Sequence, residues 1–391
     1  MPSIAFWRGS REMSERLRIL HLHSSFDRGG KELRAARLMN AFGRGIQHDV
    51  VSAVPGALGA ASAIERGIRV EYPDAFPSLS GKPTPRRLQG LAAAMKPYDL
   101  ILTYNWGAMD AVMAHTVFRD FVGLPPLIHH EDGFNEDEAT RLKPTRNWYR
   151  RIALGRASAL VVPSRKLKAV ALGPWQQPPG RVQLIPNGIS LSAYARKPAA
   201  NALPRIVKRP GELWLGTLAG LRTVKNLPRL VRAFAALPEP WQLVIVGEGP
   251  ERENIKAQAV ASGVADRVHL PGFAPDPAKA VGLFDIFALS SDSEQFPISV
   301  VEAMAAGVPI ASPAVGDVTD MVSVENRDFI CAPHDDEALA QVLGHLASDA
   351  KTRASVGAAN RAHARAHYDE ERMIAAYRQI YARALGRERF P

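Results

Sequence analysis

The chain has 391 residues, and its 49 Lys and Arg against 39 Asp and Glu give a formal net charge of +10. Hydrophobic residues make up 46% and charged residues 23%, which excludes a collagen, a long disordered chain or a coiled coil. Cys331 is the single cysteine, so an internal disulfide and a CxxC site are excluded, as expected in a reducing cytoplasm.

The first half of the chain alternates between strand and helix patterns. Residues 1–16 are too charged for a signal peptide and are interpreted as a tail. An apolar strand at 17–25 is followed by Gly29 and Gly30, an amphipathic helix and a second strand at 48–54, a βαβ unit that predicts a parallel sheet. Further strands are expected at 68–72, 99–103, 126–130, 159–163 and 181–185. Residues 17–195 are therefore predicted to form one domain, and residues 186–205, rich in Pro, Asn and Ser, its linker to the next.

The second half, residues 196–372, repeats this alternation. Strands are expected at 214–220, 241–250, 267–273, 283–291 and 308–314, and a long helical stretch follows at about 335–385. No apolar run approaches the roughly 18 residues that span a bilayer. The predicted fold class is α/β, with two Rossmann-like domains that face each other across a cleft. Ligands of such sheets bind beyond the carboxyl ends of the strands.

The positive charge is concentrated in the first half. Nine basic residues and no acidic one lie between Arg141 and Lys168, which suits an anionic membrane, a nucleic acid or a phosphorylated ligand. Within this stretch, aromatic residues stand among arginines, which suits the headgroup region of an anionic membrane; the candidates are Arg146, Trp148, Arg150 and Arg151. A solvated basic helix with inward-facing aromatics is the alternative. Nucleic acid is disfavoured because no recognition motif is present.

Glu294 and Glu302 lie eight residues apart, on either side of a Pro-containing turn that begins a helix near Ser299. The unpaired N–H groups of a helix N-terminus suit a diphosphate, and a carboxylate one turn further in can accept hydrogen bonds from ribose hydroxyls. Glu294 and the backbone of the turn can then hold a sugar; the turn comprises Phe296, Pro297, Ile298 and Ser299. The alternative is an ordinary helix start with solvated glutamates.

The string from Glu294 through EAMAAGVPIAS closely resembles the signature of family-4 retaining glycosyltransferases, which have the GT-B fold. Five other segments resemble the same family in the expected order: VPS at 162–164, IPNGIS at 185–190, KNLPRLVRAFAAL at 225–237, VIVGEGPER at 244–252 and VHLPGF at 268–273. The resemblance implies transfer from a nucleoside-diphosphate sugar, UDP- or GDP-linked, with no cofactor and no metal.

The resemblance also implies roles for matching positions. Glu302 would hold the ribose, Glu294 the hydroxyls of the donor sugar, and Lys225 the diphosphate. The remaining donor-side candidates are Gly247, Gly272 and Phe273, the last two in the base pocket. Gly29 and Gly30 would approach the phosphates or the acceptor, although a pair of glycines alone is also typical of a simple tight turn.

One position departs from the family pattern. The family usually has an arginine five residues before the lysine, where this chain has Gly220. Arg222 lies two residues further on, and two outcomes remain open. If the segment forms a loop, Arg222 can replace the missing cation; otherwise the site lacks one of its two cations.

Residues 127–138, LIHHEDGFNEDE, follow a predicted strand and are expected to face the cleft. The family places a functional histidine near this strand end, so the candidates on the acceptor side are His129, His130, Glu131 and Asp132. The histidines would orient or hydrogen-bond the reacting groups, since the leaving phosphate itself is thought to take the acceptor proton. Loop histidines bonded to backbone are the alternative, and a metal site is disfavoured because no second cluster is present.

These observations together predict a cytoplasmic hexosyltransferase peripheral to the inner face of the membrane. The C-terminal domain would bind the donor and the N-terminal domain a lipid-linked or saccharide acceptor for polysaccharide, lipopolysaccharide or glycolipid assembly. In relatives the last segment, here 373–391, crosses back to the N-terminal domain, which would bury Tyr377, Ile380 and Tyr381. A non-catalytic sugar-nucleotide-binding subunit and a UDP-sugar epimerase of the same fold are the alternatives.

Overall fold

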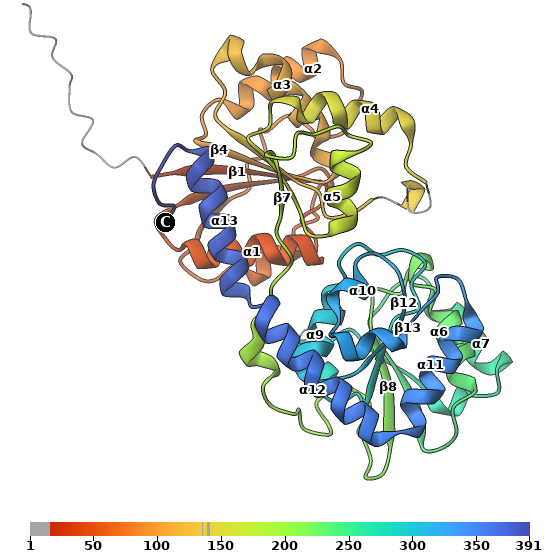
Figure 1. Cartoon of the computed structure of the whole chain (residues 1–391). Coiled ribbons are helices and arrows are strands. Elements are labelled where there is room, and N and C mark those ends of the chain that lie inside the picture. Colours follow the sequence, from red (N-terminus) through yellow and green to blue (C-terminus); the bar gives the residue numbers. More distant parts are fainter. Residues whose placement is uncertain (1–15, 135, 139–140, 275) are drawn as a thin grey trace, which may run out of the picture.

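A computed structural model describes residues 16–134, 136–138, 141–274 and 276–391. Apart from Arg16, the expected N-terminal tail lies outside the described residues. Two parallel sheets organise the chain, one in the unit coloured red to yellow-green in Figure 1 and one in the unit coloured green to blue.

The first sheet has seven parallel strands in the order β3-β2-β1-β4-β5-β6-β7. Its strands are β1 (Arg18–His23), β2 (Gln47–Ser52), β3 (Arg69–Glu71), β4 (Leu100–Tyr104), β5 (Leu127–His130), β6 (Ala159–Val162) and β7 (Val182–Leu184). Its helices are α1 (Gly30–Phe42), α2 (Pro85–Met95), α3 (Met109–Val122), α4 (Pro144–Ala153) and α5 (Arg165–Leu172). The central strand β4 is buried at every position, as expected of an apolar strand covered on both faces.

The second sheet has six parallel strands in the order β10-β9-β8-β11-β12-β13. Its strands are β8 (Leu213–Leu218), β9 (Trp241–Val246), β10 (Val268–Gly272), β11 (Ile286–Ala288), β12 (Ile310–Pro313) and β13 (Ile330–Cys331). Its helices are α6 (Leu227–Ala235), α7 (Arg252–Ala261), α8 (Ala278–Val281), α9 (Ile298–Ala306), α10 (Val318–Met321), α11 (Asp336–Ser348) and α12 (Ala350–His367). The strand order reverses between β1 and β4 in the first sheet and between β8 and β11 in the second. Ligands of doubly wound sheets bind at such switch points.

The chain crosses between the units twice. The expected helical stretch at 335–385 is three helices, of which α11 and α12 stay with the second unit and α13 (Glu370–Ala384) packs on the first (Figure 1). Tyr377, Ile380 and Tyr381 of α13 are buried in the core of the first sheet. The two crossings are hydrogen-bonded to each other, since the Ile189 amide donates to the Tyr368 carbonyl.

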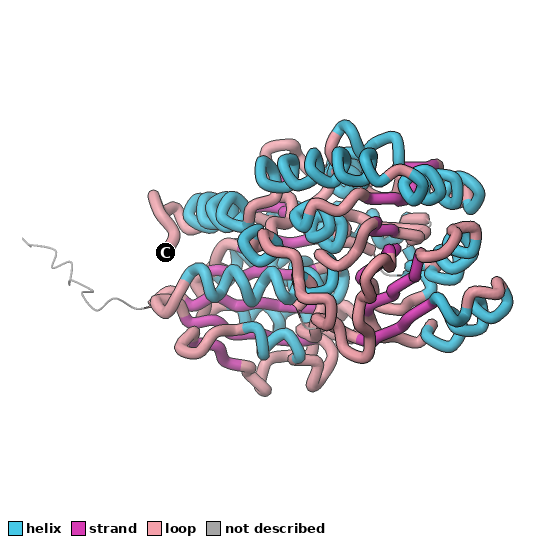
Figure 2. The backbone as a smooth tube through the Cα atoms, turned by 90° about the horizontal axis from the view of Figure 1, so that it is seen from below, coloured by secondary structure: helices cyan, strands magenta, loops and turns pink. Residues whose placement is uncertain are grey.

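Figure 2 shows helices on both sides of the strands. The loops of one unit contact those of the other. An added Cβ at Gly30 would lie 3.0 Å from Ile298 Cδ1. The Asp317 carboxylate accepts a 3.0 Å hydrogen bond from the Lys166 amide and thus caps α5 of the other unit. The loops after β1 and before α9 therefore face each other across the boundary between the units.

Candidate active site

The switch point of the second sheet brings together a cation and a carboxylate. Lys225 lies in a 3₁₀ turn (Thr223–Lys225) after β8, and Glu294 lies in the loop between β11 and α9. The Lys225 ammonium and Glu294 Oε1 are 2.5 Å apart, and the Ser291 hydroxyl donates to the same carboxylate oxygen at 2.7 Å. Parallel-sheet topology thus joins two residues that are 69 positions apart in the sequence.

Backbone contacts fix these two loops against each other. The Ser290 hydroxyl donates to the Lys225 carbonyl at 2.9 Å, and the Asp292 amide donates to the Val224 carbonyl at 2.9 Å. The Lys225 side chain remains about one-quarter exposed. Lys225 is therefore held at its backbone while its ammonium can exchange one anionic partner for another.

Helix α9 begins beside this pair without a side-chain cap, because its N-cap residue is Pro297. Such a helix start offers backbone N–H groups and a partial positive charge to an anion. The Phe296 ring is buried against Tyr368, with the ring centroids 5.7 Å apart. Ile298 and Ser299 are partly exposed at the helix start.

Glu302 lies one turn inside α9, and its Oε1 accepts a 3.0 Å hydrogen bond from the Tyr194 hydroxyl. Burial raises the pKa of Glu302 to about 7, opposed by the Tyr194 hydrogen bond and the Arg37 charge and reinforced by Asp276. Tyr194 belongs to the stretch that the sequence predicts as a linker, where a 3₁₀ turn (Leu191–Tyr194) forms. Sequence analysis missed Tyr194, since no local pattern connects it with Glu302.

The predicted donor-side glycines, Gly247 and Gly272, have backbone conformations that favour glycine. Gly247 has φ +148°, and an added Cβ would lie 1.8 Å from the Ala219 carbonyl oxygen, so only glycine fits there. Gly272, the last residue of β10, has φ +97° and is followed by the exposed Phe273. The Arg28 guanidinium of the opposite unit lies 6.0 Å from the centre of the Phe273 ring.

The segment around Gly220 is a loop, because β8 ends at Leu218. Arg222 is exposed and precedes the 3₁₀ turn that carries Lys225. This is the arrangement in which Arg222 can replace the missing cation. The charge of Arg222 is also close enough to lower the pKa of Lys31 in the first unit.

The first unit contributes further charges at the start of α1. Gly29 is the N-cap of this helix, and Lys31 follows Gly30 with an ammonium that contacts Glu32. Burial lowers the pKa of Lys31 to about 8; Asp132 and Glu131 oppose this shift, and Arg34 and Arg222 reinforce it. Sequence analysis did not single out Lys31 or Arg34.

The buried Arg34 and the partly buried Asp132 form an ion pair at the edge of this region. The Arg34 guanidinium binds both carboxylate oxygens of Asp132, at 2.5 and 2.8 Å, and also donates to Asn187 Oδ1 at 2.7 Å. Burial acts against the ionisation of Asp132, but Arg34 more than offsets it and lowers the pKa. Asp132 is thus an ionised residue held in place by α1.

The expectation that His129 and His130 face an open cleft is wrong. Both imidazoles are buried, with exposed fractions of 0% and 1%. His130 donates to the Thr103 carbonyl at 3.2 Å and accepts from the Tyr381 hydroxyl at 3.2 Å, and burial lowers its pKa to about 3. His130 is therefore a neutral core histidine, while His129 bonds the Thr103 hydroxyl at 2.8 Å. Strand alternation could not reveal this, because β5 is covered on both faces.

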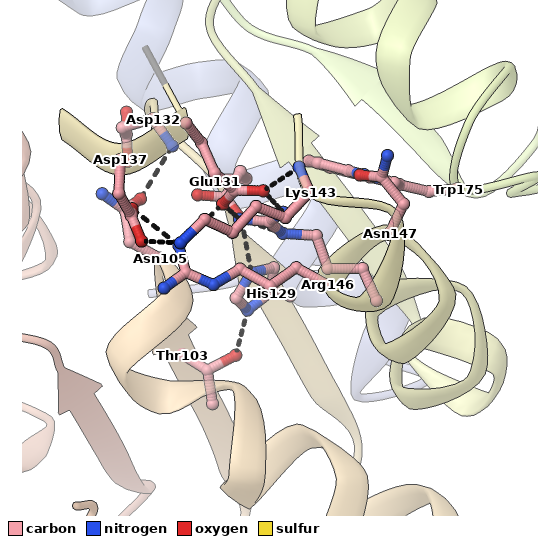
Figure 3. Close-up of polar contacts among 12 residues, drawn as sticks. Thr103, Asn105, His129, Glu131, Asp132, Asp137, Lys143, Arg146, Asn147 and Trp175 are labelled. Atoms are coloured by element: carbon pink, nitrogen blue, oxygen red, sulfur yellow. Dashed lines mark hydrogen bonds and ion pairs between the residues drawn. The ribbon is translucent and has the colours of Figure 1, made fainter. Parts of the chain in front are cut away.

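Glu131 is also fully buried rather than exposed on a loop. It lies 3.6 Å from His129 Nε2 (Figure 3) and 3.6 Å from Arg150 Nε. Within the described residues its carboxylate oxygens have no hydrogen-bond partner. Its charge faces that of Arg150, so the strand end and helix α4 are coupled electrostatically.

Arg150 was expected to contact a membrane, and this prediction is wrong. The side chain has an exposed fraction of 0% and forms two hydrogen bonds with Glu138, at 3.0 and 3.2 Å. It is enclosed by the rings of Trp106, Phe134 and Trp175. The guanidinium therefore anchors the 3₁₀ turn Glu136–Glu138 to α4.

Arg146 is engaged in the same way, although less deeply. It donates to Asp137 at 2.9 Å (Figure 3) and to Glu138 at 3.1 Å, and its guanidinium lies over the Trp106 ring. The acidic partners Asp137 and Glu138 precede the basic stretch and neutralise part of its charge.

Trp148 and Arg151 of the same stretch point outward. Trp148 is 64% exposed, and Phe121 on the adjacent helix α3 is 85% exposed.

Within the described residues, no helix is long and apolar enough to cross a membrane. In the same part of the chain, no three His, Cys, Asp or Glu side chains are grouped so that they could hold a metal ion.

Comparison with known proteins gives the family. Residues 28–193 match the family described as Glycosyltransferase Family 4, and residues 203–363 match Glycosyl transferases group 1. The chain belongs to glycosyltransferase family 4. The predicted family is thus confirmed for both units.

Individual relatives agree with this assignment. The chain is 31% identical over 219 residues to D-inositol 3-phosphate glycosyltransferase of Xylanimonas cellulosilytica, an alignment that covers 53% of this chain and 52% of the relative. It is 25% identical over 341 residues to the putative glycosyltransferase EpsF of Bacillus subtilis, covering 78% of this chain and 82% of the relative. The chain thus spans about half the length of some of the curated relatives it matches.

The fold is shared with solved structures. The crystal structure of HepE of Anabaena in complex with UDP superposes with a TM-score of 0.77 at 20% identity, covering 94% of this chain and 100% of that chain. The predicted fold class, two Rossmann-like units of the GT-B type, is confirmed.

Proposed function

We propose that this family-4 protein is a retaining hexosyltransferase that uses a nucleoside-diphosphate sugar and extends a lipid-linked or saccharide acceptor. The observation that carries the proposal is the Lys225–Glu294 pair beside the uncapped start of α9, with Glu302 one turn further in. The helix N–H groups and the Lys225 cation suit a diphosphate. The Glu294 carboxylate suits the hydroxyls of a hexose, and the Glu302 carboxylate suits those of a ribose.

On donor binding, the diphosphate would lie on the N–H groups at the start of α9, and Lys225 would exchange Glu294 for a phosphate oxygen. The freed Glu294 carboxylate would then accept hydrogen bonds from the sugar. In the transfer step, the bond between the anomeric carbon and the phosphate oxygen breaks and a bond to the acceptor oxygen forms on the same face. The acceptor proton passes to the leaving phosphate, whose charge Lys225 neutralises.

Two further cations suit this leaving group. Lys31 comes from the first unit and Arg222 from the second, and Arg222 is close enough to lower the pKa of Lys31. We assign Arg222 the place of the cation absent at Gly220. A positive side chain at the start of α1 is unfavourable for an isolated helix, so an anion bound there would stabilise it. UDP is the first nucleotide to test, because HepE structures contain UDP and UDP-glucose.

We also propose that the protein works on the inner face of the cytoplasmic membrane, in polysaccharide or glycolipid assembly. Trp148, Phe121 and Ile152 are exposed apolar side chains on the neighbouring helices α3 and α4, and Arg151 lies among them. Aromatic and basic side chains together suit an anionic headgroup region. This outward-facing set replaces the predicted patch, from which Arg150 is removed.

The test is nucleoside-diphosphate release from UDP- and GDP-linked hexoses, with and without a bacterial lipid-linked saccharide fraction. Release that requires the acceptor and is lost in Lys225→Met would support the proposal. Conversion of the donor sugar without any acceptor would instead indicate an epimerase. Binding without turnover, for every donor and acceptor tried, would indicate a non-catalytic subunit.

A further inference from the structure

Tyr194 contributes a hydrogen bond to the donor site from outside both sheets. It lies in the 3₁₀ turn of the first crossing between the units, and its side chain is only 7% exposed. Its hydroxyl donates to Glu302 Oε1 at 3.0 Å, across 108 positions of sequence. Burial raises the pKa of Tyr194, so the hydroxyl keeps its proton and remains a donor.

We infer that Tyr194 is a positioning residue for the nucleotide: its hydroxyl fixes one oxygen of Glu302 so that the carboxylate is ionised and its other oxygen is free for the ribose. This inference rests on the proposed function, in which Glu302 accepts from ribose hydroxyls. A carboxylate has two oxygens, and one hydrogen bond from the protein leaves the second available.

The surroundings of Glu302 explain why this hydrogen bond matters. The groups that act on the carboxylate are Tyr194 from the crossing, Arg37 from α1 and Asp276 just before α8. Burial is the strongest influence and favours the protonated form, whereas Tyr194 and Arg37 favour the ionised form. Arg37 is also engaged by Glu370 at 3.2 Å and by the Gly188 carbonyl, also at 3.2 Å. Tyr194 is therefore the direct hydrogen-bond donor on which ionisation depends.

The crossing holds Tyr194 firmly enough for this role. Ile189 donates to the Tyr368 carbonyl at 3.0 Å and accepts from the Glu370 amide at 3.1 Å, so the two crossings form a short paired segment. An added Cβ at Gly188 would lie 2.8 Å from the Asp369 carbonyl oxygen, which shows how closely they approach. A change in the crossing would consequently reach the ribose site through one hydrogen bond.

The experiment is a calorimetric titration with UDP, or with GDP if only GDP binds, at intervals from pH 5.5 to 9. The variants are Tyr194→Phe, which removes only the hydroxyl, and Glu302→Gln, which cannot ionise. Tyr98→Phe is the matched control, because Tyr98 also donates to a carboxylate, that of Asp49, at 2.9 Å, but at the amino ends of strands in the first sheet.

We expect the wild-type affinity to fall as the pH decreases through about 7, because protonation of Glu302 removes an acceptor. In Tyr194→Phe the fall should begin at higher pH; an increase of one pKa unit makes binding about tenfold weaker at pH 6 and nearly unchanged at pH 9. Tyr98→Phe should follow the wild type, and Glu302→Gln should lose this pH dependence.

An unchanged affinity profile in Tyr194→Phe, with a melting temperature equal to that of the wild type, would overturn the inference. A uniform loss of affinity at every pH would also overturn it, because a merely structural role would have that effect. If the wild type binds no nucleoside diphosphate, the proposed function fails instead, so the two failures are distinguishable.

Discussion

Replacing Lys225 by Met removes one positive charge from the switch point and keeps a side chain of similar length. A unit charge pair about 4 Å apart, at an effective dielectric constant of about 20, attracts by about 4 kcal/mol. Lys225 must first leave Glu294, which lies 2.5 Å away, so part of this attraction is lost. A net cost of about 2–3 kcal/mol remains, and Lys225→Met should weaken UDP binding by about 30- to 150-fold.

The assay compares calorimetric titrations of UDP and uridine into the wild type and the variant. Because the lost interaction is with phosphate, the affinity for uridine should be equal in the two proteins. Lys256→Met is the matched control, since Lys256 is an exposed lysine of the same unit that pairs with Glu253 at 2.8 Å. UDP affinity that survives in Lys225→Met, or an equal loss for UDP and uridine, would refute the assignment of Lys225 to the diphosphate.

Three further predictions concern the first unit. Lys31→Met should weaken UDP binding about tenfold at pH 7 but not at pH 9. The pKa of Lys31 is about 8, so the wild-type side chain has largely lost its charge at pH 9. A difference in affinity that does not change with pH would argue against a charge effect. Arg150→Met should lower the free energy of unfolding by about 3–5 kcal/mol in urea titrations, because it leaves Glu131 buried without its arginine and removes two hydrogen bonds from Glu138. The exposed Arg151→Met should change the free energy of unfolding by less than about 0.5 kcal/mol; similar effects in both would contradict the anchor. The double change Phe121→Ser and Trp148→Ser should reduce cosedimentation with anionic phospholipid vesicles without altering UDP affinity, and unreduced cosedimentation would exclude this face from membrane contact.

Local sequence patterns predicted most of the fold. Apolar strands followed by glycine turns and amphipathic helices indicated both parallel sheets, and the family resemblance correctly implied the return of the last helix. The two-residue strand β13 (Ile330–Cys331) was missed because it is too short to show a period. The predicted linker is irregular for most of its length, and only the structure reveals its contact with Glu302.

The site was predictable where its residues lie close together in the sequence. It was not predictable where segments distant in the sequence determine whether a side chain is buried. Glu294 and Glu302 are recognisable by their spacing, and their helix start follows from local rules. Arg150 belongs to a basic stretch in the sequence, but Glu138 and three aromatic rings from distant segments enclose it. His130 is buried, and its Nε2 bonds the hydroxyl of Tyr381, which is 251 residues away in the sequence. Burial is thus the property that the single sequence could not supply.

The most direct test of the donor site is thermal unfolding of the wild type and Glu302→Ala with UDP, GDP, ADP, CMP and dTDP. A ligand present at about 100 times its dissociation constant stabilises the folded state by about 2.7 kcal/mol, which gives a measurable increase in melting temperature. We expect one nucleoside diphosphate to raise the melting temperature of the wild type and to raise that of Glu302→Ala much less. No increase with any of the five nucleotides would contradict the assignment of the start of α9 as the donor site, and an equal increase in both proteins would contradict the assignment of Glu302 to the ribose.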